Sequence, residues 1–326
     1  MTDPADWKSL SPAFMAALRR YDRAARARVL RAQRRDAVTA PPYHYTDRGG
    51  LAGIITAQIV WFTHYQHMND DREIKFGMSV ANTVLSDIGD RLPKAKIFCD
   101  LVADLFSAEN LDSVFDFYIA SFSRRRDDPH QWKNYARAGE GFAIGLALQL
   151  FGIEPDRPNR KAHENIFVSP VRYGAPAGRD LQRPAIESAA RIIAETAEHK
   201  ATAMQDINRG MPFFREMADR LLAAELILHG LTVKGLDWSP ENEVRLFILV
   251  QRASLAPFVS TRSRSTETVP FIKSDMRLHE PGSITEILVG PAAPRDAEDF
   301  ACSLLAPFHS DPRSIVHRST ASIAGL

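Results

Sequence analysis

Hydrophobic and polar positions alternate along the chain with two periods, and these divide it into helical and extended segments. Apolar side chains from Leu10 to Tyr21 recur every three or four residues, which predicts one helix over residues 6–37. Pro41 and Pro42 end that helix, because proline lacks the backbone N–H that a helix needs. We therefore predict a basic amphipathic helix over residues 1–40 and a single α+β domain over residues 41–326.

The rest of the pattern predicts a mixture of strands and helices. Strands are expected at 43–46, 59–63, 115–122, 141–146, 166–173, 244–250, 271–273, 284–289 and 314–317, with helices at 47–55, 69–92 and 296–305. Residues 178–229 are mostly helical by pattern, with a break at 210–212, and residues 253–267 are expected to form a loop. Strands and helices do not alternate regularly. The predicted fold class is therefore α+β: a mixed, mostly antiparallel sheet with flanking helices and a helical insertion at about 178–229.

Composition narrows the class of protein without naming a function. Hydrophobic residues make up 45% and charged residues 25% of the 326 positions, so the chain can build a folded core. The net charge of +1 gives no global field that would gather nucleic acid or an anionic membrane. The chain has two cysteines, no apolar run long enough for a membrane span, and no signal-peptide pattern. We expect a cytoplasmic protein with no membrane partner.

The first helix carries a dense run of arginines, from Arg19 to Arg35. Two interpretations stay open: an arm that binds phosphates, or the solvated face of a helix that packs on the domain. Elsewhere the sequence contains neither the glycine-rich dinucleotide-binding motif nor a P-loop, so neither kind of phosphate site is supported.

The predicted strand at 43–46 has the sequence Tyr-His-Tyr-Thr. Side chains alternate along a strand, so His44 and Thr46 share one face while Tyr43 and Tyr45 share the other. A histidine beside a hydroxyl suits hydrogen bonding to a ribose or a phosphate. The alternative is a half-buried strand with a structural histidine.

Two further polar clusters follow predicted strands. Ser121 and Ser123 share one face at the end of a strand, and Tyr135 lies shortly after them, where its ring could stack on a planar group or pack in the core. Glu241, Glu243 and Arg245 are expected on one face of a strand that enters a very apolar segment. Because buried charge is costly, these carboxylates either stabilise a cation in a reaction or belong to a Glu–Arg ion-pair lattice, in which Arg245 would pair with Glu73 or Asp70.

A metal site is a weaker hypothesis. His64 and His67 precede a run of carboxylates that begins at Asp70, and with His44 and Glu73 they could serve a metal-assisted hydrolase. Their spacing matches no zinc signature, so we predict no metal. Asn69 and Asp70 are better explained as caps of the helix that follows.

Read in chain order, these clusters resemble a bacterial family, the domain of unknown function family 2971. The resemblance runs from about residue 42 to residue 323. The elements that carry it are Tyr43–Thr46, Met68–Asp70 with Glu73, Ser121–Ser123, Trp132 with Tyr135-Ala136, Gly141–Gly145, Trp238 with Glu241, Glu243 and Arg245, and Glu286–Pro291. The family name implies no activity.

The chain also resembles, more distantly, ADP-ribosyltransferase-like folds. The similarity lies in a first strand with His44 and Thr46, a middle Ser-x-Ser strand (121–123) and a late Glu-x-Glu strand (241–243). The resemblance implies that NAD is the substrate and that His44 holds its ribose. It further implies that Ser121 and Ser123, with Tyr45 or Tyr135, shape the nicotinamide pocket. Glu243 would be catalytic, and Glu241 would contact the acceptor.

The function expected from this resemblance is transfer of ADP-ribose from NAD to an unknown acceptor, in a toxin or phage-defence context. A fixed carboxylate fits this chemistry, because cleavage of the nicotinamide–ribose bond develops positive charge on the ribose. The acceptor is left open between nucleic acid and protein. A different class, a non-catalytic module that binds a ligand or nucleic acid, is the alternative.

Overall fold

A computed structural model of the chain gives the fold. It describes residues 12–35, 38–68, 73–107, 115–151, 160–161, 166–199, 207–221, 225–251, 259–264 and 266–322. Contacts within the chain divide it into two units, each built from three separate segments. Unit 1 comprises Met1–Arg35, Asp71–Val114 and Arg172–Leu236, and unit 2 comprises Asp36–Asp70, Phe115–Val171 and Asp237–Leu326.

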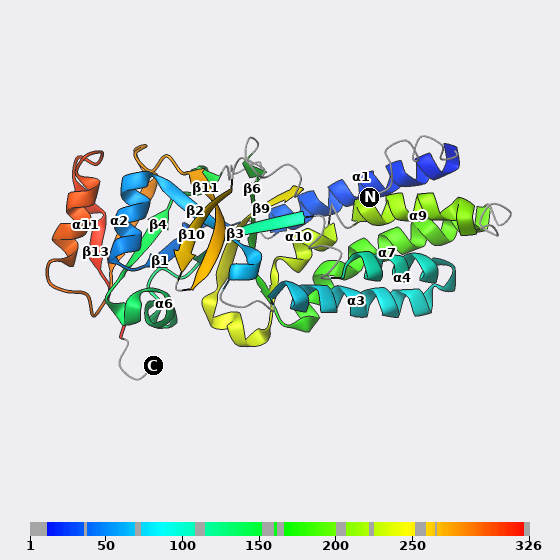
Figure 1. Cartoon of the computed structure of the whole chain (residues 1–326), viewed down its shortest axis with the longest axis horizontal. Helices are drawn as coiled ribbons and strands as arrows, with labels where there is room; N and C mark the ends of the chain where they lie inside the picture. The colour runs from blue at the N-terminus through cyan, green and yellow to red at the C-terminus, as the bar shows by residue number, and fades with distance from the viewer. Residues whose placement is uncertain are drawn as a thin grey trace. The chain divides into compact units, whose positions relative to one another are not determined.

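Unit 1 is largely helical. Its helices are α1 (Pro12–Arg35), α3 (Glu73–Arg91), α4 (Lys96–Leu105), α7 (Ala175–His199), α9 (Ile207–Leu221) and α10 (Ile227–Gly230), with a 3₁₀ turn η3 (Pro93–Ala95). Figure 1 shows the long helices running side by side. Two short strands, β7 (Arg172–Tyr173) and β8 (Val233–Lys234), form a separate parallel pair. The predicted helical insertion thus packs with helices from two other parts of the chain.

Helix α1 confirms the predicted N-terminal helix over its described residues, and one face of it is buried. Phe14 stacks on Phe213 with ring centroids 4.4 Å apart. The Tyr21 hydroxyl donates to Glu225 Oε2 at 2.9 Å, and Arg28 Nη2 donates to the same oxygen at 2.7 Å. Burial, followed by the charge of Glu225, raises the pKa of Tyr21 above its ordinary range. Because Glu225 is 1% exposed, these hydrogen bonds anchor α1 to the interior of unit 1.

The arginines of the outer face of α1 remain exposed at positions 19, 23, 26 and 31. The structure is compatible with both interpretations of this run, so the phosphate-binding arm stays a prediction. Where the prediction of a break at 210–212 falls, helix α9 continues through Pro212. That prediction is wrong because Pro212 lies near the start of the helix, where it removes only one intrahelical hydrogen bond.

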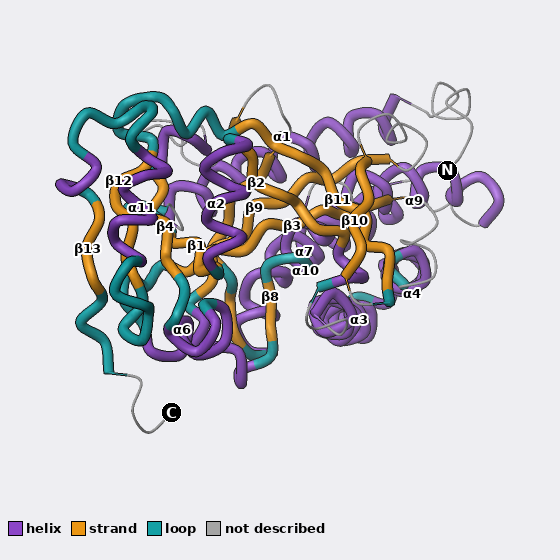
Figure 2. Tube along the Cα trace, turned by 60° about the vertical axis from the view of Figure 1, so that its left-hand side comes forward, coloured by secondary structure: helices purple, strands orange, loops and turns teal. Residues whose placement is uncertain are grey.

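Unit 2 contains an eleven-stranded sheet. Its main path runs β10 (Val259–Arg264), β11 (Glu267–Asp275), β2 (Ile59–His64), β3 (Phe115–Ser123), β1 (Tyr43–Thr46), β4 (Phe142–Leu146), β12 (Ile284–Val289) and β13 (Val316–Arg318). Off this path, β9 (Glu243–Gln251) pairs with β3 and with β6 (Ile166–Pro170), which pairs with β5 (Arg160–Lys161). Figure 2 shows the strands succeeding one another from β13 to β10. Within this sheet, β12 and β13 are parallel and the other described pairs are antiparallel, which confirms the predicted α+β class.

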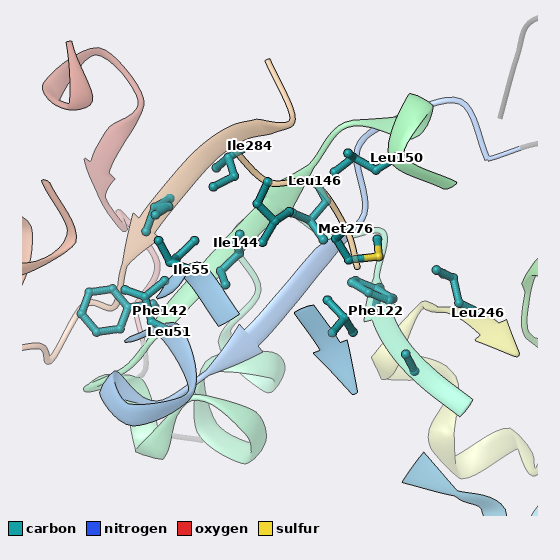
Figure 3. Close-up of a cluster of buried hydrophobic side chains, with 14 of the residues drawn as sticks. Leu51, Ile55, Phe122, Phe142, Ile144, Leu146, Leu150, Leu246, Met276 and Ile284 are labelled. Carbon is teal, nitrogen blue, oxygen red and sulfur yellow. The ribbon is translucent and has the colours of Figure 1, made fainter. Parts of the chain in front are cut away.

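One face of this sheet is the core of unit 2. Helices α2 (Arg48–Ala57) and α11 (Ala297–Leu305) contribute Leu51, Ile55 and Leu305 to it, and the strands contribute Phe122 and Ile144, among others. Figure 3 shows Leu51, Ile55, Phe122 and Ile144 as sticks among the buried side chains of this core. The Asp47 side chain accepts a hydrogen bond from the Gly50 N–H at 2.7 Å and caps α2, as the sequence predicted. Because side chains alternate along a strand, the positions between these buried residues face away from this core.

The loop predicted at 253–267 is corrected by the structure. Residues 259–264 form strand β10, whose sequence Val-Ser-Thr-Arg-Ser-Arg has few apolar positions. The pattern failed because β10 lies at the edge of the sheet and buries little side-chain area, so its sequence does not need a hydrophobic period.

None of the helices in the described part of the chain combines the length and hydrophobicity needed to cross a bilayer.

Candidate functional site

Three strands that lie far apart in the sequence are neighbours at the centre of the sheet. β3 lies between β1 and β9, and Ser123 is directly opposite both Tyr43 and Glu243. Ser121 is opposite Arg245 in the same ladder. Directly opposite residues of antiparallel strands share a face, and alternate residues of a strand share a face. Tyr43, Tyr45, Ser121, Ser123, Glu243 and Arg245 therefore lie on the face away from the core described above, which we call the polar face.

Glu243 and Arg245 form a buried ion pair on the polar face. Arg245 Nε donates to Glu243 Oε1 at 2.8 Å, and Nη2 donates to Oε2 at 3.2 Å. The two residues are 3% and 0% exposed. The alternate spacing of strand positions brings both side chains to one side, and the two-pronged contact fixes the orientation of the carboxylate.

Glu241 does not continue the strand, which corrects the expectation that Glu241, Glu243 and Arg245 share a strand face. It ends the 3₁₀ turn η7 (Leu236–Glu241), and Asn242 takes a left-handed backbone conformation with φ 46°. The Glu241 carbonyl accepts hydrogen bonds from Ser123 Oγ and from Gln131 Nε2, each at 2.9 Å. Its side chain accepts a hydrogen bond from the Tyr135 hydroxyl. Glu241 is thus held beside the polar face by side chains of β3 and α6.

Helix α6 (Pro129–Tyr135) brings Tyr135 into this cluster. Asp128 caps the helix by accepting a hydrogen bond from the His130 N–H at 2.8 Å. Trp132 is fully buried against Tyr45, edge to face, with ring centroids 4.9 Å apart. The Tyr45 hydroxyl donates to the carbonyl oxygen of Arg125 at 2.9 Å, and burial raises its pKa. Tyr45 therefore acts here as a buried support of the loop before α6.

Asp127 is a site residue to which the sequence gave no role. It accepts hydrogen bonds from Trp132 Nε1 and from Ser319 Oγ, both at 2.6 Å. Burial alone would raise the pKa of Asp127, but the hydrogen bonds from Ser319 and Trp132 outweigh it and hold the pKa low. The sequence does contain one indication of this role, the pair Asp127-Asp128 before Pro129. A helix needs only one capping aspartate, here Asp128, so the other can accept hydrogen bonds elsewhere.

The edge of β3 forks at the polar face. β2 pairs with Tyr118 and Ile119, and β1 pairs with Ser123. The recorded strand pairs along that edge end at Ile119 and resume at Ser123, and we call the stretch between them, residues 120–122, the fork. Ser121 lies at the fork, and its Oγ is buried without a hydrogen-bond partner in the described part of the chain. A buried hydroxyl that lacks a partner is costly, so the fork offers a hydrogen-bonding position to a ligand.

His44 and Thr46 lie on the opposite face from Ser121 and Ser123, as strand alternation predicted for β1. The His44 ring packs against Phe122 with centroids 5.5 Å apart, and its Nδ1 lies 3.3 Å from the Ser121 carbonyl oxygen. Burial lowers the pKa of His44. The structure thus separates His44 and Thr46 from the serines, Tyr45 and the glutamates, and it gives His44 the role of satisfying a backbone carbonyl at the fork.

A surface cluster beside the polar face was also missed. Glu286 accepts a hydrogen bond from the Tyr43 hydroxyl at 2.6 Å and a two-pronged contact from Arg126, whose Nη2 lies 2.7 Å from Oε2. Burial and the contact with Glu286 raise the pKa of Tyr43. These residues come from three strands or loops far apart in the sequence, so no local pattern could have joined them.

In the described residues no three histidine, cysteine or acidic side chains gather as metal ligands would. His64 Nε2 lies 3.2 Å from Asp116 Oδ1, and His67 Nδ1 lies 3.7 Å from Glu267 Oε2, so these two histidines of the metal hypothesis face different carboxylates. Asp70 of that hypothesis lies outside the described residues.

The fold and the site define an α+β protein with a forked, mostly antiparallel sheet and a buried polar cluster at the fork. Residues 131–246 match the family model described as "Protein of unknown function (DUF2971)", and this match confirms the family resemblance drawn from the sequence. The matched range is shorter than the resemblance, but it includes Tyr135, Glu241, Glu243 and Arg245. No curated protein and no solved structure gives a significant match.

Proposed function

We propose that the chain is an ADP-ribosyltransferase-like enzyme that cleaves the nicotinamide–ribose bond of NAD and transfers ADP-ribose to an acceptor. The proposal includes a toxin or phage-defence context and a cytoplasmic location, and two free thiols, Cys99 and Cys302, fit a reducing compartment. One observation carries it: Ser123 of the Ser-x-Ser strand lies directly opposite Glu243 of the Glu-x-Glu segment and directly opposite Tyr43 of the first strand.

The residues at the fork suit a nucleotide ligand. The Ser121 hydroxyl is buried without a partner in the described part of the chain and can bond to a ribose or amide group. Tyr135 and Glu241 lie beside the same face as Ser121 and Glu243. His44 and Thr46 are left out of the proposed contact, because they face the core side of the sheet.

In the reaction, the bond between C1′ of the ribose and the nicotinamide nitrogen breaks, and its electron pair leaves with nicotinamide. The acceptor nucleophile forms the new bond to C1′ and gives up its proton. Glu243 is held in a fixed orientation by Arg245, so it is a preorganised carboxylate in a site that excludes water, where such groups act most strongly. Glu241 is the better placed of the two to take the acceptor proton, since it lies in a turn outside the strand ladder.

The test is nicotinamide release from NAD by the purified chain, compared with Ser121→Ala and Glu241→Gln. Removing one electrostatic or hydrogen-bonding group of an active site costs about 10²–10³-fold in rate. Ser303→Ala on the exposed surface of α11 is the matched control and keeps full activity. No release, together with no NAD binding by calorimetry, contradicts the proposal.

One observation favours a non-catalytic binding module as the second candidate. Arg245 neutralises Glu243 by direct contact, and a buried pair of this kind is also a common structural device. A module would bind a ligand at the fork in calorimetry and release no nicotinamide.

A further inference from the structure

Trp61 is an exposed aromatic side chain on a strand, at 42% exposure. The other face of β2 buries Val60 and Phe62 in the core. The Trp61 ring lies against Phe271 of the neighbouring strand β11, with centroids 4.6 Å apart and planes tilted by 37°. Phe271 is 4% exposed, so it supports the indole from below and leaves part of the indole open to a ligand.

Arg262 of the edge strand β10 reaches across β11 to the same ring. Its guanidinium carbon lies 5.0 Å from the Trp61 ring centre, and its Nη2 lies 3.3 Å from Thr63 Oγ1. The Arg262 Nε is buried and has no hydrogen-bond partner in the described part of the chain. Burial, followed by the nearby charge of Arg264, lowers the pKa of Arg262. An anion at this place would give the guanidinium both a partner and a compensating charge.

Two more cations border the ring pair. Lys273 is directly opposite Trp61 in the ladder, and its Nζ lies 6.0 Å from the Phe271 ring centre. Arg264 follows Arg262 at the next position of β10 on the same face, about 6.7 Å along the strand. Two acids lie on the same face: Glu267, 59% exposed and 3.7 Å from Arg264, and the exposed Asp275, two positions after Lys273 on β11. The surface formed by Trp61, Arg262, Arg264, Phe271 and Lys273, which we call the edge platform, is therefore aromatic and positively charged.

The edge platform and the polar face belong to one face of the sheet. Thr63 is directly opposite Ile119, so Trp61, two residues before Thr63, shares its face with Ser121, two residues after Ile119. The same register, continued, would place Trp61 opposite Ser121, and the strands part at this point to form the fork. A group stacked on Trp61 thus lies on the side of the sheet that carries the proposed reaction site.

We propose that the edge platform binds unpaired nucleotides of a single-stranded nucleic acid, with a base stacked on Trp61 and phosphates on Arg262, Arg264 and Lys273. Stacking on aromatic rings combined with a basic track along the backbone is how proteins hold single strands without reading their sequence. The proposal that this nucleic acid is the acceptor of ADP-ribose rests on the proposed function. Its binding is argued from the residues of the edge platform alone.

The observations favour a polymer over one nucleotide or an acidic peptide. The cations extend along the edge strand beyond the ring, where a chain of phosphates can follow them and a lone nucleotide cannot. A peptide carboxylate would satisfy Arg262 but would leave the exposed part of the Trp61 side chain unused. Charged residues on an edge strand also prevent edge-to-edge pairing, and that role alone would require neither the exposed Trp61 nor its stacking on Phe271.

The experiment measures fluorescence anisotropy of a labelled oligonucleotide of about 16 nucleotides, the upper site size for one such surface, as a single strand and as its duplex. We expect the single strand to bind more tightly than the duplex. Trp61→Ala should weaken binding about 5- to 150-fold, the loss of one stacked base, and Trp61→Phe should retain most of it. Arg262→Gln with Arg264→Gln should reduce the slope of log affinity against log salt by about 1.4, two phosphate contacts at 0.7 each.

Arg313→Gln is the matched control, because it removes one charge from an arginine that is 72% exposed and lies on a different edge of unit 2. Circular dichroism melts of every variant check that the fold is kept. The proposal is overturned if Trp61→Ala binds the strand as the wild type does, if the duplex binds equally well, or if NAD alone displaces the strand and loses affinity in Trp61→Ala.

Binding is measured without NAD, and nicotinamide release is measured without oligonucleotide, so the two proposals fail separately. Strand binding that depends on Trp61, with neither nicotinamide release nor NAD binding by calorimetry, refutes the transferase and supports the platform. Release without strand binding does the reverse.

Discussion

The buried pair of Glu243 and Arg245 makes the sharpest prediction about stability. Glu243→Gln keeps the size of the side chain but removes the negative charge that contacts the guanidinium of Arg245, which is 0% exposed. The two contacts that hold the pair, at 2.8 Å and 3.2 Å, are replaced by at most one good hydrogen bond from a neutral oxygen. The variant should therefore be much less stable than the wild type, whatever the reaction.

The magnitude follows from the burial. Breaking a buried pair by neutralising one partner costs about 3–5 kcal/mol, a large fraction of the 5–15 kcal/mol that stabilises a typical domain. In a unit of this size, each kcal/mol lowers Tm by about 2–4 °C, so the expected decrease is roughly 6–20 °C. Replacing both partners, as in Glu243→Leu with Arg245→Met, should recover most of the loss, because neither charge of the pair is then buried.

The assay is a thermal melt followed by circular dichroism, with urea unfolding to obtain the free energy. Glu298→Gln is the matched control, since Glu298 pairs with Arg318 at 3.0 Å but at 39% and 36% exposure. An exposed pair of this kind contributes about 0–1 kcal/mol. A Tm for Glu243→Gln within about 2 °C of the wild type would refute the reasoning, and a double variant as unstable as the single one would refute the charge as its cause.

Four further substitutions test local features of unit 2. Gly145→Ala should lower the free energy of unfolding by about 1–3 kcal/mol, because its Cβ would lie 2.6 Å from Thr285 Oγ1. A Cβ at Gly53 on α2 meets nothing within 4 Å, so Gly53→Ala should raise the free energy of unfolding by about 0.4–1 kcal/mol. Urea titrations check both variants. Because folding lowers the pKa of His44, the unfolded chain binds more protons just below pH 6.5, so stability should fall as the pH drops through that range, and less so in His44→Gln. An equal pH slope in both proteins would contradict the burial of neutral His44. Trp132→Phe removes the 2.6 Å hydrogen bond that Trp132 Nε1 donates to Asp127, and it should lower the free energy of unfolding by about 1–3 kcal/mol. Urea denaturation measures this loss.

The features that the sequence predicted well are those set by neighbouring residues. The cap at Asp47, the alternation along β1 and the apolar runs of β3, β4 and β9 depend on side-chain periodicity within a few positions. The strand at residues 259–264 was not predicted, because an exposed edge strand has no apolar face that would give its sequence a hydrophobic period. Glu241 was misplaced because the left-handed conformation of Asn242, a local turn, interrupts the strand pattern that Glu-x-Glu suggested.

The parts of the site that could not be predicted depend on which strands become neighbours. Ser123 is opposite both Tyr43 and Glu243 only because β3 lies between β1 and β9, and these pairings join positions 80 and 120 residues apart in the sequence. The fork arises because two strands share one edge of β3, so no single strand sequence encodes it. The role of His44 as partner of the Ser121 carbonyl follows from that fork and not from the histidine itself.

The interleaving of the two units has a consequence for how the chain is made. Each unit draws on three segments, with those of the other unit between them, so the chain passes from one unit to the other at 35–36, 70–71, 114–115, 171–172 and 236–237. During synthesis, unit 1 cannot close until Leu236 has emerged from the ribosome, and the main path of the sheet in unit 2 waits for β13 near its far end. Contacts of such long sequence separation form slowly, so nascent strands such as β3 and β9 spend time unpaired and in reach of other chains. Yield in a cell-free translation reaction should therefore depend on holding chaperones, and every contiguous fragment that contains all of one unit also carries segments of the other.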